Sequence, residues 1–348
     1  MNSRDRVLTA FAHEEPDRVP CWCGASTEFW AKAKRELDLD DEGLRLRMGD
    51  DFRRVFARYA GPEIELAPGV TSVTPFGVER EGIGYGQPVS HPLAGATLEE
   101  VEAYAWPDPL LMDVSNIRAE AEAYGREYAI LGGDWSPFWH DLIDLLGMEN
   151  MYLKMYDDPP LIDAIIERLV DYYATVSQWI FDDAADAIDV FFIGNDFGGQ
   201  RGSLLSEEMF RRFILPHLKR LTDLGHDYDL KVMLHCCGGF CELIPAMIEI
   251  GIDGLHAIQP CCRGMELARL KAEFGDKILF NGAIDSQHVL IDGDVDFVRR
   301  ETHKVLEVMK PGGGYVAGAS HDWILEETPV ENVLAMFDAV REFGVYGA

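Results

Sequence analysis

The chain has 348 residues, of which 47% are hydrophobic, and its 61 acidic residues against 31 basic ones give a formal net charge of −30. Such a charge repels nucleic acid and anionic membranes, so neither is an expected partner. No apolar run approaches the ~18 residues of a membrane span, and residues 1–20 lack the apolar core of a signal peptide. We therefore expect a cytoplasmic protein.

Strand-like apolar runs alternate with amphipathic helical patterns over most of the chain. The predicted strands are Val19–Cys23, Ala129–Gly133, Ile188–Ile193, Lys231–His235, Gly254–Ile258, Ile278–Asn281 and Tyr315–Ala319. An eighth strand is expected near Phe52–Tyr59, where the pattern does not separate strand from helix. Strands that alternate with helices predict a parallel sheet.

The predicted helices fill the intervals between these strands. They are Leu161–Phe181, Glu207–Leu224, Glu242–Ile250 and Thr328–Phe343. Residues 61–95 are rich in Gly, Pro and Val without a helical period, which predicts a β-hairpin excursion. No Gly-rich dinucleotide turn follows the first strand, which favours a (β/α)₈ TIM barrel over a doubly wound open sheet within the α/β class. We expect one domain over residues 1–348.

The seven cysteines form three clusters, which in a cytoplasmic chain indicates metal binding or reactive thiols rather than disulfides. His235 and Cys237 are two residues apart at the end of a predicted strand, so they share a face and suit zinc. A catalytic zinc needs a third protein ligand. Candidates are Cys261 or Cys262, after the next strand, and His321, after the last one. The alternative is a buried thiol beside a hydrogen-bonded histidine.

Carboxylates also follow several predicted strands, at the edge where a barrel keeps its chemistry. They are Asp134, Asp196, Asp285 and Asp322. Such groups can orient a histidine, act as general bases or bind a cationic substrate, and aspartate is equally a favoured helix cap. Ser206 is the more natural cap of the helix after Asp196, which leaves Asp196 available for chemistry. Cys21 and Cys23 read either as core residues or as a second thiol pair.

A set of short motifs then extends over most of the chain. They are Met155–Pro159, Asp196–Gln200, His235–Gly238, Leu243–Pro245, Gly251–Asp253, Gln259–Pro260, Met265, Leu270–Lys271, Phe274–Asp276, Asn281–Asp285 and Thr328–Asn332. As a set they resemble the uroporphyrinogen decarboxylase superfamily, which contains the decarboxylase itself and a branch of corrinoid- and zinc-dependent methyltransferases. The resemblance implies a barrel whose active site lies at the carboxyl ends of the strands.

The two branches of this superfamily place different demands on the site. The decarboxylase holds a polyanionic tetrapyrrole with an Arg-Gln-Ala-Gly-Arg stretch, where this chain has residues 21–26, Cys-Trp-Cys-Gly-Ala-Ser, without arginine. The aspartate that follows in the decarboxylase matches Asp50 or Asp51. The methyltransferases carry His-x-Cys, matched by His235 and Cys237, and a distant cysteine for which residues 318–329 offer no match.

The resemblance therefore implies a zinc-dependent transfer of a methyl group from a corrinoid, such as methylcobalamin on a partner protein, to a small thiol. Asp196, Gln200 and Asp285 would orient the substrate. The residues expected to bind substrate are Cys23, Asp51, Asp134, Asn281 and His321. The alternatives are decarboxylation of a porphyrinogen, which needs no metal, and an inactive barrel that binds a metal or ligand. A homodimer is the expected assembly.

Overall fold

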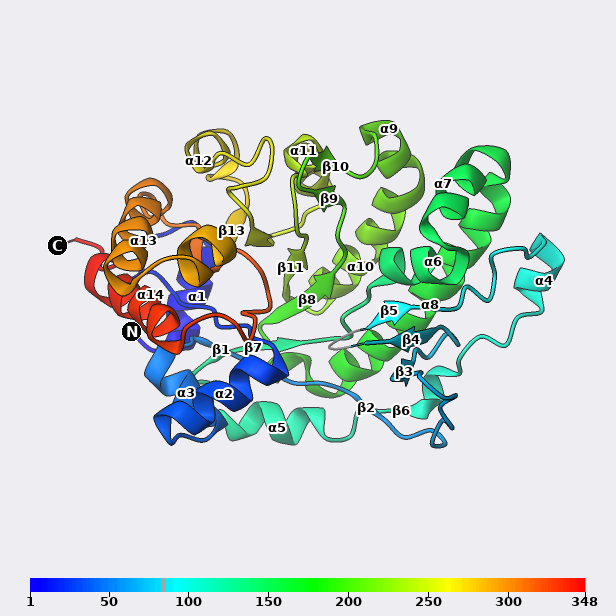
Figure 1. Ribbon diagram of the computed structural model, residues 1–348, viewed down its shortest axis with the longest axis horizontal. Helices are drawn as coiled ribbons and strands as arrows, with labels where there is room; N and C mark the ends of the chain where they lie inside the picture. The colour runs from blue at the N-terminus through cyan, green and yellow to red at the C-terminus, as the bar shows by residue number, and fades with distance from the viewer. Residues whose placement is uncertain (83–85, 348) are drawn as a thin grey trace.

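The protein is described by a computed structural model, which covers residues 1–82 and 86–347. Its centre is a parallel seven-stranded sheet in the order β1-β7-β8-β11-β12-β13-β14, curled into a barrel and surrounded by helices (Figure 1). The strands are β1 (Phe52–Arg54), β7 (Ala129–Gly132), β8 (Val190–Gly194), β11 (Lys231–His235), β12 (Gly254–Ile258), β13 (Leu279–Ile284) and β14 (Tyr315–Ala319). The TIM-barrel prediction is confirmed.

The eighth place in the barrel is taken by an extended segment rather than a regular strand. The backbone N–H of Trp22 donates to the carbonyl of Ala317 at 2.9 Å, and that of Ala317 donates to the carbonyl of Pro20 at 2.8 Å. On the other side, Asp51 N–H donates to the carbonyl of Cys21 at 2.9 Å. The predicted strand Val19–Cys23 is therefore in the right place but is not a full strand, because Pro20 has no N–H to donate.

The helices follow the predicted alternation. They are α1 (Ser3–Phe11), α2 (Thr27–Leu37), α3 (Asp41–Met48), α4 (Leu98–Glu102), α5 (Ile117–Ala123), α6 (Phe138–Leu146), α7 (Met148–Asp157), α8 (Pro159–Ala184), α9 (Glu207–Met209), α10 (Leu215–Asp227), α11 (Ile244–Glu249), α12 (Leu267–Phe274), α13 (Val295–Met309) and α14 (Val330–Phe343). The helix predicted over Glu207–Leu224 is interrupted by a π-helical turn at Phe210–Ile214. No helix among the residues described is long and apolar enough to cross a membrane.

Alternate residues of the strands fill the barrel interior. They form one cluster with Trp22 and with the apolar face of α1, and the strand members include Phe52, Leu131, Phe192, Met233, Leu279 and Val316. The α1 helix covers the amino ends of the strands, since a Cβ on Gly254, the first residue of β12, would lie 3.1 Å from the Phe11 ring. The opposite, carboxyl ends remain for the site.

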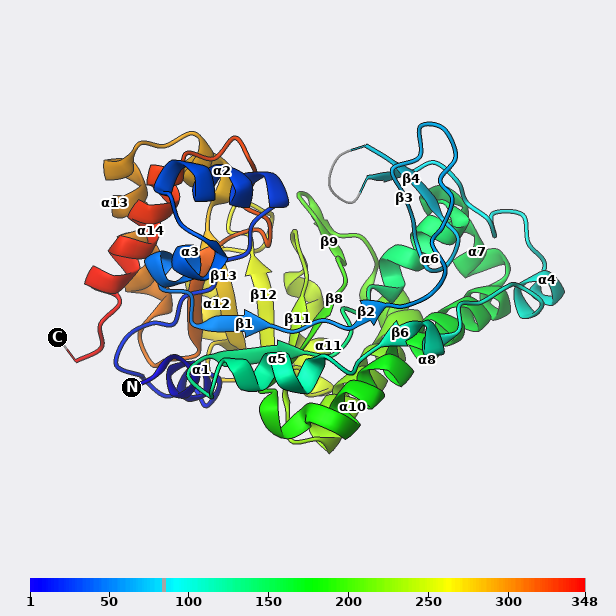
Figure 2. The ribbon, with the colours of Figure 1, turned by 90° about the horizontal axis from the view of Figure 1, so that it is seen from below.

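The predicted excursion at residues 61–95 is confirmed as a small antiparallel sheet beside the barrel (Figure 2). Its strands are β3 (Ser72–Val73), β4 (Glu79–Glu81) and β5 (Gln87–Pro88), and part of it, residues 83–85, lies outside the described residues. Arg80 of β4 forms an ion pair with Asp144 of α6. Two shorter pairs complete the strands, β2 (Arg58–Tyr59) with β6 (Met112–Asp113) and β9 (Gly198–Gly199) with β10 (Gly202–Ser203).

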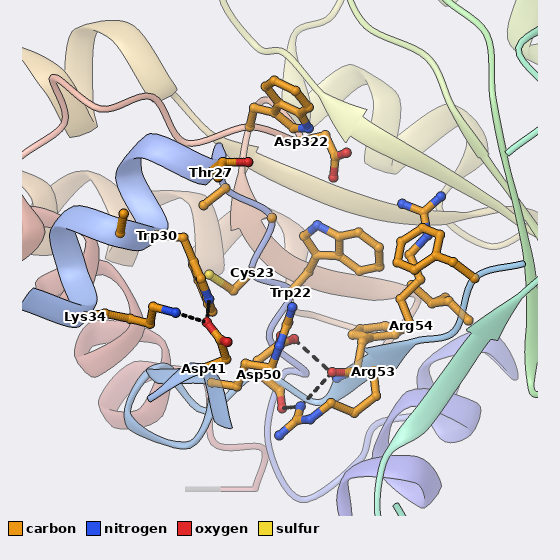
Figure 3. A pocket seen from close by; sticks show the side chains of 18 of the residues that line it. Trp22, Cys23, Thr27, Trp30, Lys34, Asp41, Asp50, Arg53, Arg54 and Asp322 are labelled. Atoms are coloured by element: carbon orange, nitrogen blue, oxygen red, sulfur yellow. Dashed lines mark hydrogen bonds and ion pairs between the residues drawn. The ribbon is translucent and has the colours of Figure 1, made fainter. Parts of the chain in front are cut away.

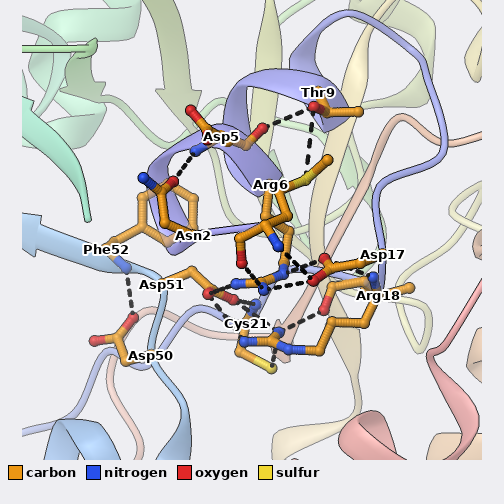
Figure 4. Close-up of polar contacts among 12 residues, drawn as sticks. Asn2, Asp5, Arg6, Thr9, Asp17, Arg18, Cys21, Asp50, Asp51 and Phe52 are labelled. Carbon is orange, nitrogen blue, oxygen red and sulfur yellow. Dashed lines mark hydrogen bonds and ion pairs between the residues drawn. The ribbon is translucent and has the colours of Figure 1, made fainter. Parts of the chain in front are cut away.

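Asp51, which directly precedes β1, joins the segments that meet where the barrel closes, namely α1, residues 18–21 and β1; we call this junction the seam (Figure 4). Its fully buried carboxylate accepts hydrogen bonds from Arg6 at 2.7 Å, from Arg18 at 2.9 Å and from the N–H of Cys21 at 2.7 Å. These bonds join α1 and the extended segment to β1. The structure does not bring Asp51, an expected substrate-binding residue, to the site, because its oxygens are engaged by the protein and it precedes the strand whose far end faces the site.

Replacing Asp51 with Asn should lower the free energy of unfolding by about 3–5 kcal/mol, because two arginines lose their buried counter-charge. Urea unfolding of the variant beside the parent measures this loss. Asp276→Asn is the matched control, since the Asp276 side chain is 79% exposed and should change little. An Asp51→Asn variant as stable as its control would show that the seam does not depend on this carboxylate.

Asp141 of α6 makes stability depend on pH. Burial, aided by the negative charge of Asp144, raises its pKa to about 7, against a hydrogen bond from Tyr173 that lowers it. Between about pH 4, near the pKa of an unfolded aspartate, and about pH 7, near the folded value, Asp141 is protonated in the folded state only. Its contribution to the free energy of unfolding therefore falls as pH rises, by at most about 1.4 kcal/mol per pH unit. Asp141→Asn should therefore gain stability relative to the parent from about pH 4 to 7. Urea unfolding across this range tests the sign, and a constant difference would contradict it.

Candidate metal centre and active site

Three side chains converge at the carboxyl ends of β8 and β11. Asp196, His235 and Cys237 place one ligand atom each within 4.8 Å of the others, the one such group of three among the described residues. His235 Nε2 lies 3.2 Å from the Cys237 Sγ and 3.4 Å from an oxygen of Asp196. Nitrogen, sulfur and oxygen donors thus face one point.

The register of two neighbouring strands builds this group. His235 pairs with Gly194, so Cys237 and Asp196, each two residues further on, emerge opposite one another. The N–H of Cys237 donates to an Asp196 oxygen at 2.7 Å, which fixes the carboxylate beside the thiol. Asp196 N–H in turn donates to His140 Nε2 at 3.0 Å.

Glycines allow the loops of the site to approach one another closely. A Cβ on Gly194 would lie 1.9 Å from the Trp135 ring, so only glycine lets that indole cover the end of β8. A Cβ on Gly198 would lie 2.6 Å from the carbonyl of Cys237. The β9–β10 hairpin can therefore pack directly on the loop that carries the thiol.

The electrostatics of the three groups suit a cation. Burial lowers the pKa of His235, which keeps the imidazole neutral and able to act as a ligand. Burial raises the pKa of Cys237 well above its usual value, and the negative charge of Asp196 adds to this effect. Burial opposes ionisation of Asp196 as well, but interactions with His140 and the hydrogen bond from the N–H of Cys237 favour the carboxylate, and its pKa is lowered. A divalent cation would stabilise the Cys237 thiolate beside the Asp196 carboxylate, and zinc accepts all three donor types.

The other expected metal ligands do not join this group. Cys261 is exposed, and the Sγ of Cys262 lies 3.4 Å from Gln259 Oε1, which also accepts the N–H of Gly238 at 3.1 Å. His321 faces the same cavity as His235, but its Nδ1 accepts the N–H of Trp323 at 3.0 Å. In this geometry the third donor is Asp196, which the sequence pattern had suggested for orienting substrate.

The remaining expected site residues do not belong to the three-donor group. Asp134 accepts the N–H of Ser136, and burial raises its pKa to about 6. Asp285 caps the helical turn that follows β13 through the N–H groups of residues 287 and 288. The Sγ of Cys23 lies 3.2 Å from the sulfur of Met48. Asn281 is fully buried in β13.

Gln200 is exposed and lies in the β9–β10 turn. Its backbone carbonyl accepts the N–H of Arg263 at 3.2 Å. Of the residues assigned to catalysis from the sequence, only Asp196 therefore belongs to the three-donor group, whereas Gln200 and Asp285 lie on the loops around it.

Two adjoining cavities open at this end of the barrel. One, of about 340 Å³, is lined by Asp196, His235, His140 and His321. The other, of about 740 Å³, is lined by aromatic side chains and by Arg53 and Arg54 (Figure 3). Its aromatic residues are Trp22, Trp30, Phe52, Phe56, Trp135 and Trp323. Trp135, Asp322 and Trp323 line both, so a ligand in the larger cavity lies beside the three-donor group.

Sequence reasoning missed His140 and His256. His140 contacts Asp196 from α6, more than fifty positions earlier in the chain, and no sequence motif distinguishes it from other histidines. His256 could have been found from the sequence, because it is the one polar side chain in the correctly predicted strand Gly254–Ile258. In the barrel it pairs in register with His235, and their Nδ1 atoms are 2.9 Å apart.

Two characterised proteins are similar to this chain in sequence. The chain is 21% identical over 231 residues to the methylcobamide:CoM methyltransferase MtbA of Methanosarcina acetivorans, covering 65% of this chain and 62% of that protein. It is 23% identical to the uroporphyrinogen decarboxylase of Methylococcus capsulatus, covering 75% and 73%. The match thus spans less than two thirds of the first of these relatives.

The fold and the family follow from two further comparisons. A solved structure described as a methyltransferase from Methanosarcina mazei superposes with a TM-score of 0.71 at 20% identity, covering 99% of both chains. This likeness shows the barrel fold. The model of the family described as uroporphyrinogen decarboxylase (URO-D) matches residues 76–343. The chain belongs to the uroporphyrinogen decarboxylase family.

Proposed function

We propose that this protein is a zinc-dependent methyltransferase that moves a methyl group from a corrinoid to a small thiol. The observation that carries the proposal is the convergence of Asp196, His235 and Cys237 at the carboxyl end of the barrel. A catalytic zinc takes three protein ligands and keeps one position open. Two of the three donors, Asp196 and His235, border a cavity of about 340 Å³, which is large enough for a small molecule at that open position.

Each part of the site has a role in this reaction. Zinc at this position would bind the substrate thiol and lower its pKa, which supplies a thiolate at neutral pH. The N–H of Cys237 holds the Asp196 carboxylate in place, and Trp135 covers the inner side of the site. The sulfur–carbon bond forms as the carbon–cobalt bond breaks, and the electron pair of the broken bond stays with the corrinoid.

The relatives support the choice of methyl donor. The Methanosarcina acetivorans relative is named as a methylcobamide:CoM methyltransferase, and we extend that class of methyl donor to this chain. We expect the corrinoid to arrive on a partner protein that docks at the barrel mouth, over the larger cavity. The homodimer and the single domain over residues 1–348 stay predictions.

Decarboxylation of a tetrapyrrole is the second candidate. Its support is the similarity to a uroporphyrinogen decarboxylase together with Asp50, whose pKa burial raises to about 6 at the wall of the larger cavity. Against it, the segment at residues 21–26 has no arginine, and Arg45 and Arg53 form ion pairs with Asp50 and Glu42. Incubation with uroporphyrinogen and analysis of the product carboxylates tests this reaction directly.

The metal content of the purified protein should be about one zinc per chain, measured by elemental mass spectrometry without chelator. His235→Ala and Cys237→Ser should abolish it, and Asp196→Asn should lower it, because each removes one of three ligands. Cys261→Ser is the matched control and should keep its zinc, since this thiol is exposed and outside the group. A parent protein without zinc affinity would refute the mechanism, and zinc loss in Cys261→Ser would move the third ligand to that loop.

The proposed activity should appear as demethylation of methylcobalamin by a small thiol, followed by the change in corrinoid absorbance. Cys237→Ser should lower the rate at least about 100-fold, equivalent to about 2.7 kcal/mol of transition-state stabilisation. Removal of zinc with a chelator should do the same to the parent, and zinc should restore it. A zinc-loaded protein inactive with every thiol tested would instead favour a barrel that binds a metal without turnover.

A further inference from the structure

A second buried histidine lies directly behind the metal centre. His256 of β12 is fully buried and pairs in register with His235 of β11, so both rings project from the same side of the sheet. Their Nδ1 atoms are 2.9 Å apart, a hydrogen-bond distance. One of the two nitrogens must carry the proton and the other must accept it.

Metal binding decides which nitrogen carries the proton. The Nε2 of His235 is the atom that faces Cys237 and Asp196, at 3.2 and 3.4 Å, so Nε2 is the atom that would bind a metal and must be unprotonated. A neutral His235 then holds its proton on Nδ1, and this N–H donates a hydrogen bond to the Nδ1 of His256. The Nδ1 of His256 is therefore an acceptor, and its own proton lies on Nε2.

The far nitrogen of His256 has an acceptor within reach. Its Nε2 is buried and has no hydrogen-bond partner among the residues described, and an oxygen of Asp322 lies 3.8 Å from it. Asp322 also lines both cavities, and its side chain is 13% exposed. The His256 ring is held by contacts with the rings of Trp22 and Phe192, whose centroids lie at 4.6 and 5.3 Å.

We propose that His256 and Asp322 are positioning residues of the metal centre. The Nδ1 of His256 accepts a hydrogen bond from the protonated Nδ1 of His235, and the Nε2–H of His256 donates a hydrogen bond to Asp322, so that one tautomer and one orientation of the metal-binding ring are held. The inference rests on the proposed function, because it presumes that His235 binds a metal. Partners of this kind are typically worth 10–100-fold in metal affinity.

Paired variants separate this role from simple packing. His256→Phe keeps a ring against Trp22 and Phe192 but removes both nitrogens, whereas His256→Asn can restore an acceptor where Nδ1 now lies. Asp322→Asn removes only the terminal charge. His303→Phe, on the exposed surface of α13, and Asp276→Asn are the matched controls. Circular dichroism and thermal unfolding verify that each variant is folded.

Zinc affinity, measured by competition with a chelating dye, is the main readout. His256→Phe should bind zinc 10–100-fold more weakly than the parent, His256→Asn should recover most of that loss, and Asp322→Asn should show a smaller loss. The visible spectrum of the protein loaded with cobalt(II), which reports ligand geometry, should change in His256→Phe and return towards that of the parent in His256→Asn.

Each result has a distinct meaning. Parental zinc affinity and cobalt spectrum in His256→Phe would overturn the inference and leave the metal centre intact. A loss in His256→Phe that His256→Asn does not recover would also overturn it, in favour of packing. Parental affinity in Asp322→Asn would remove that residue from the proposal. A parent protein that binds no zinc would instead refute the proposed function itself.

Discussion

The barrel depends on the ion pairs and hydrogen bonds at Asp51. A closed parallel barrel needs every strand edge to be paired, yet the segment before α2 contains a proline and offers only a few hydrogen bonds to β14 and β1. The carboxylate of Asp51 compensates by joining Arg6 of α1, Arg18 and the backbone of Cys21 to the start of β1. Trp22, which follows directly, is thereby set into the barrel interior, where it contacts His256.

At the opposite end of the barrel, the register between neighbouring strands brings the side chains of the candidate site together. The pairing of β8 with β11 brings Asp196 to Cys237, and the pairing of β11 with β12 brings His256 to His235. A slip of one residue in either pair would turn one side chain of each couple to the other face of the sheet. The three-donor group and its buried histidine partner thus result from how three adjacent strands align.

The wall of the larger cavity carries basic as well as acidic side chains. The chain carries a net charge of −30, but Arg53 and Arg54 lie at the wall of the larger cavity. Arg54 is stacked over the rings of Phe56 and Trp135, at 4.5 and 4.9 Å from their centroids. The aromatic rings around Arg54 therefore form much of the surface that a ligand in this cavity would contact, whereas Arg53 is engaged by Glu42.

The sequence by itself determined the barrel class, because strand and helix periods are local: Lys231–His235, Gly254–Ile258 and Tyr315–Ala319 are observed as predicted. It also determined the His235–Cys237 pair, whose spacing alone puts both side chains on one face. Only the tertiary structure decided the third donor and the buried partner of His235, since Asp196 and His256 meet that pair through hydrogen-bonded register between strands. It likewise gave Asp51 a structural role, because the arginines that bind it come from segments 33 and 45 residues away.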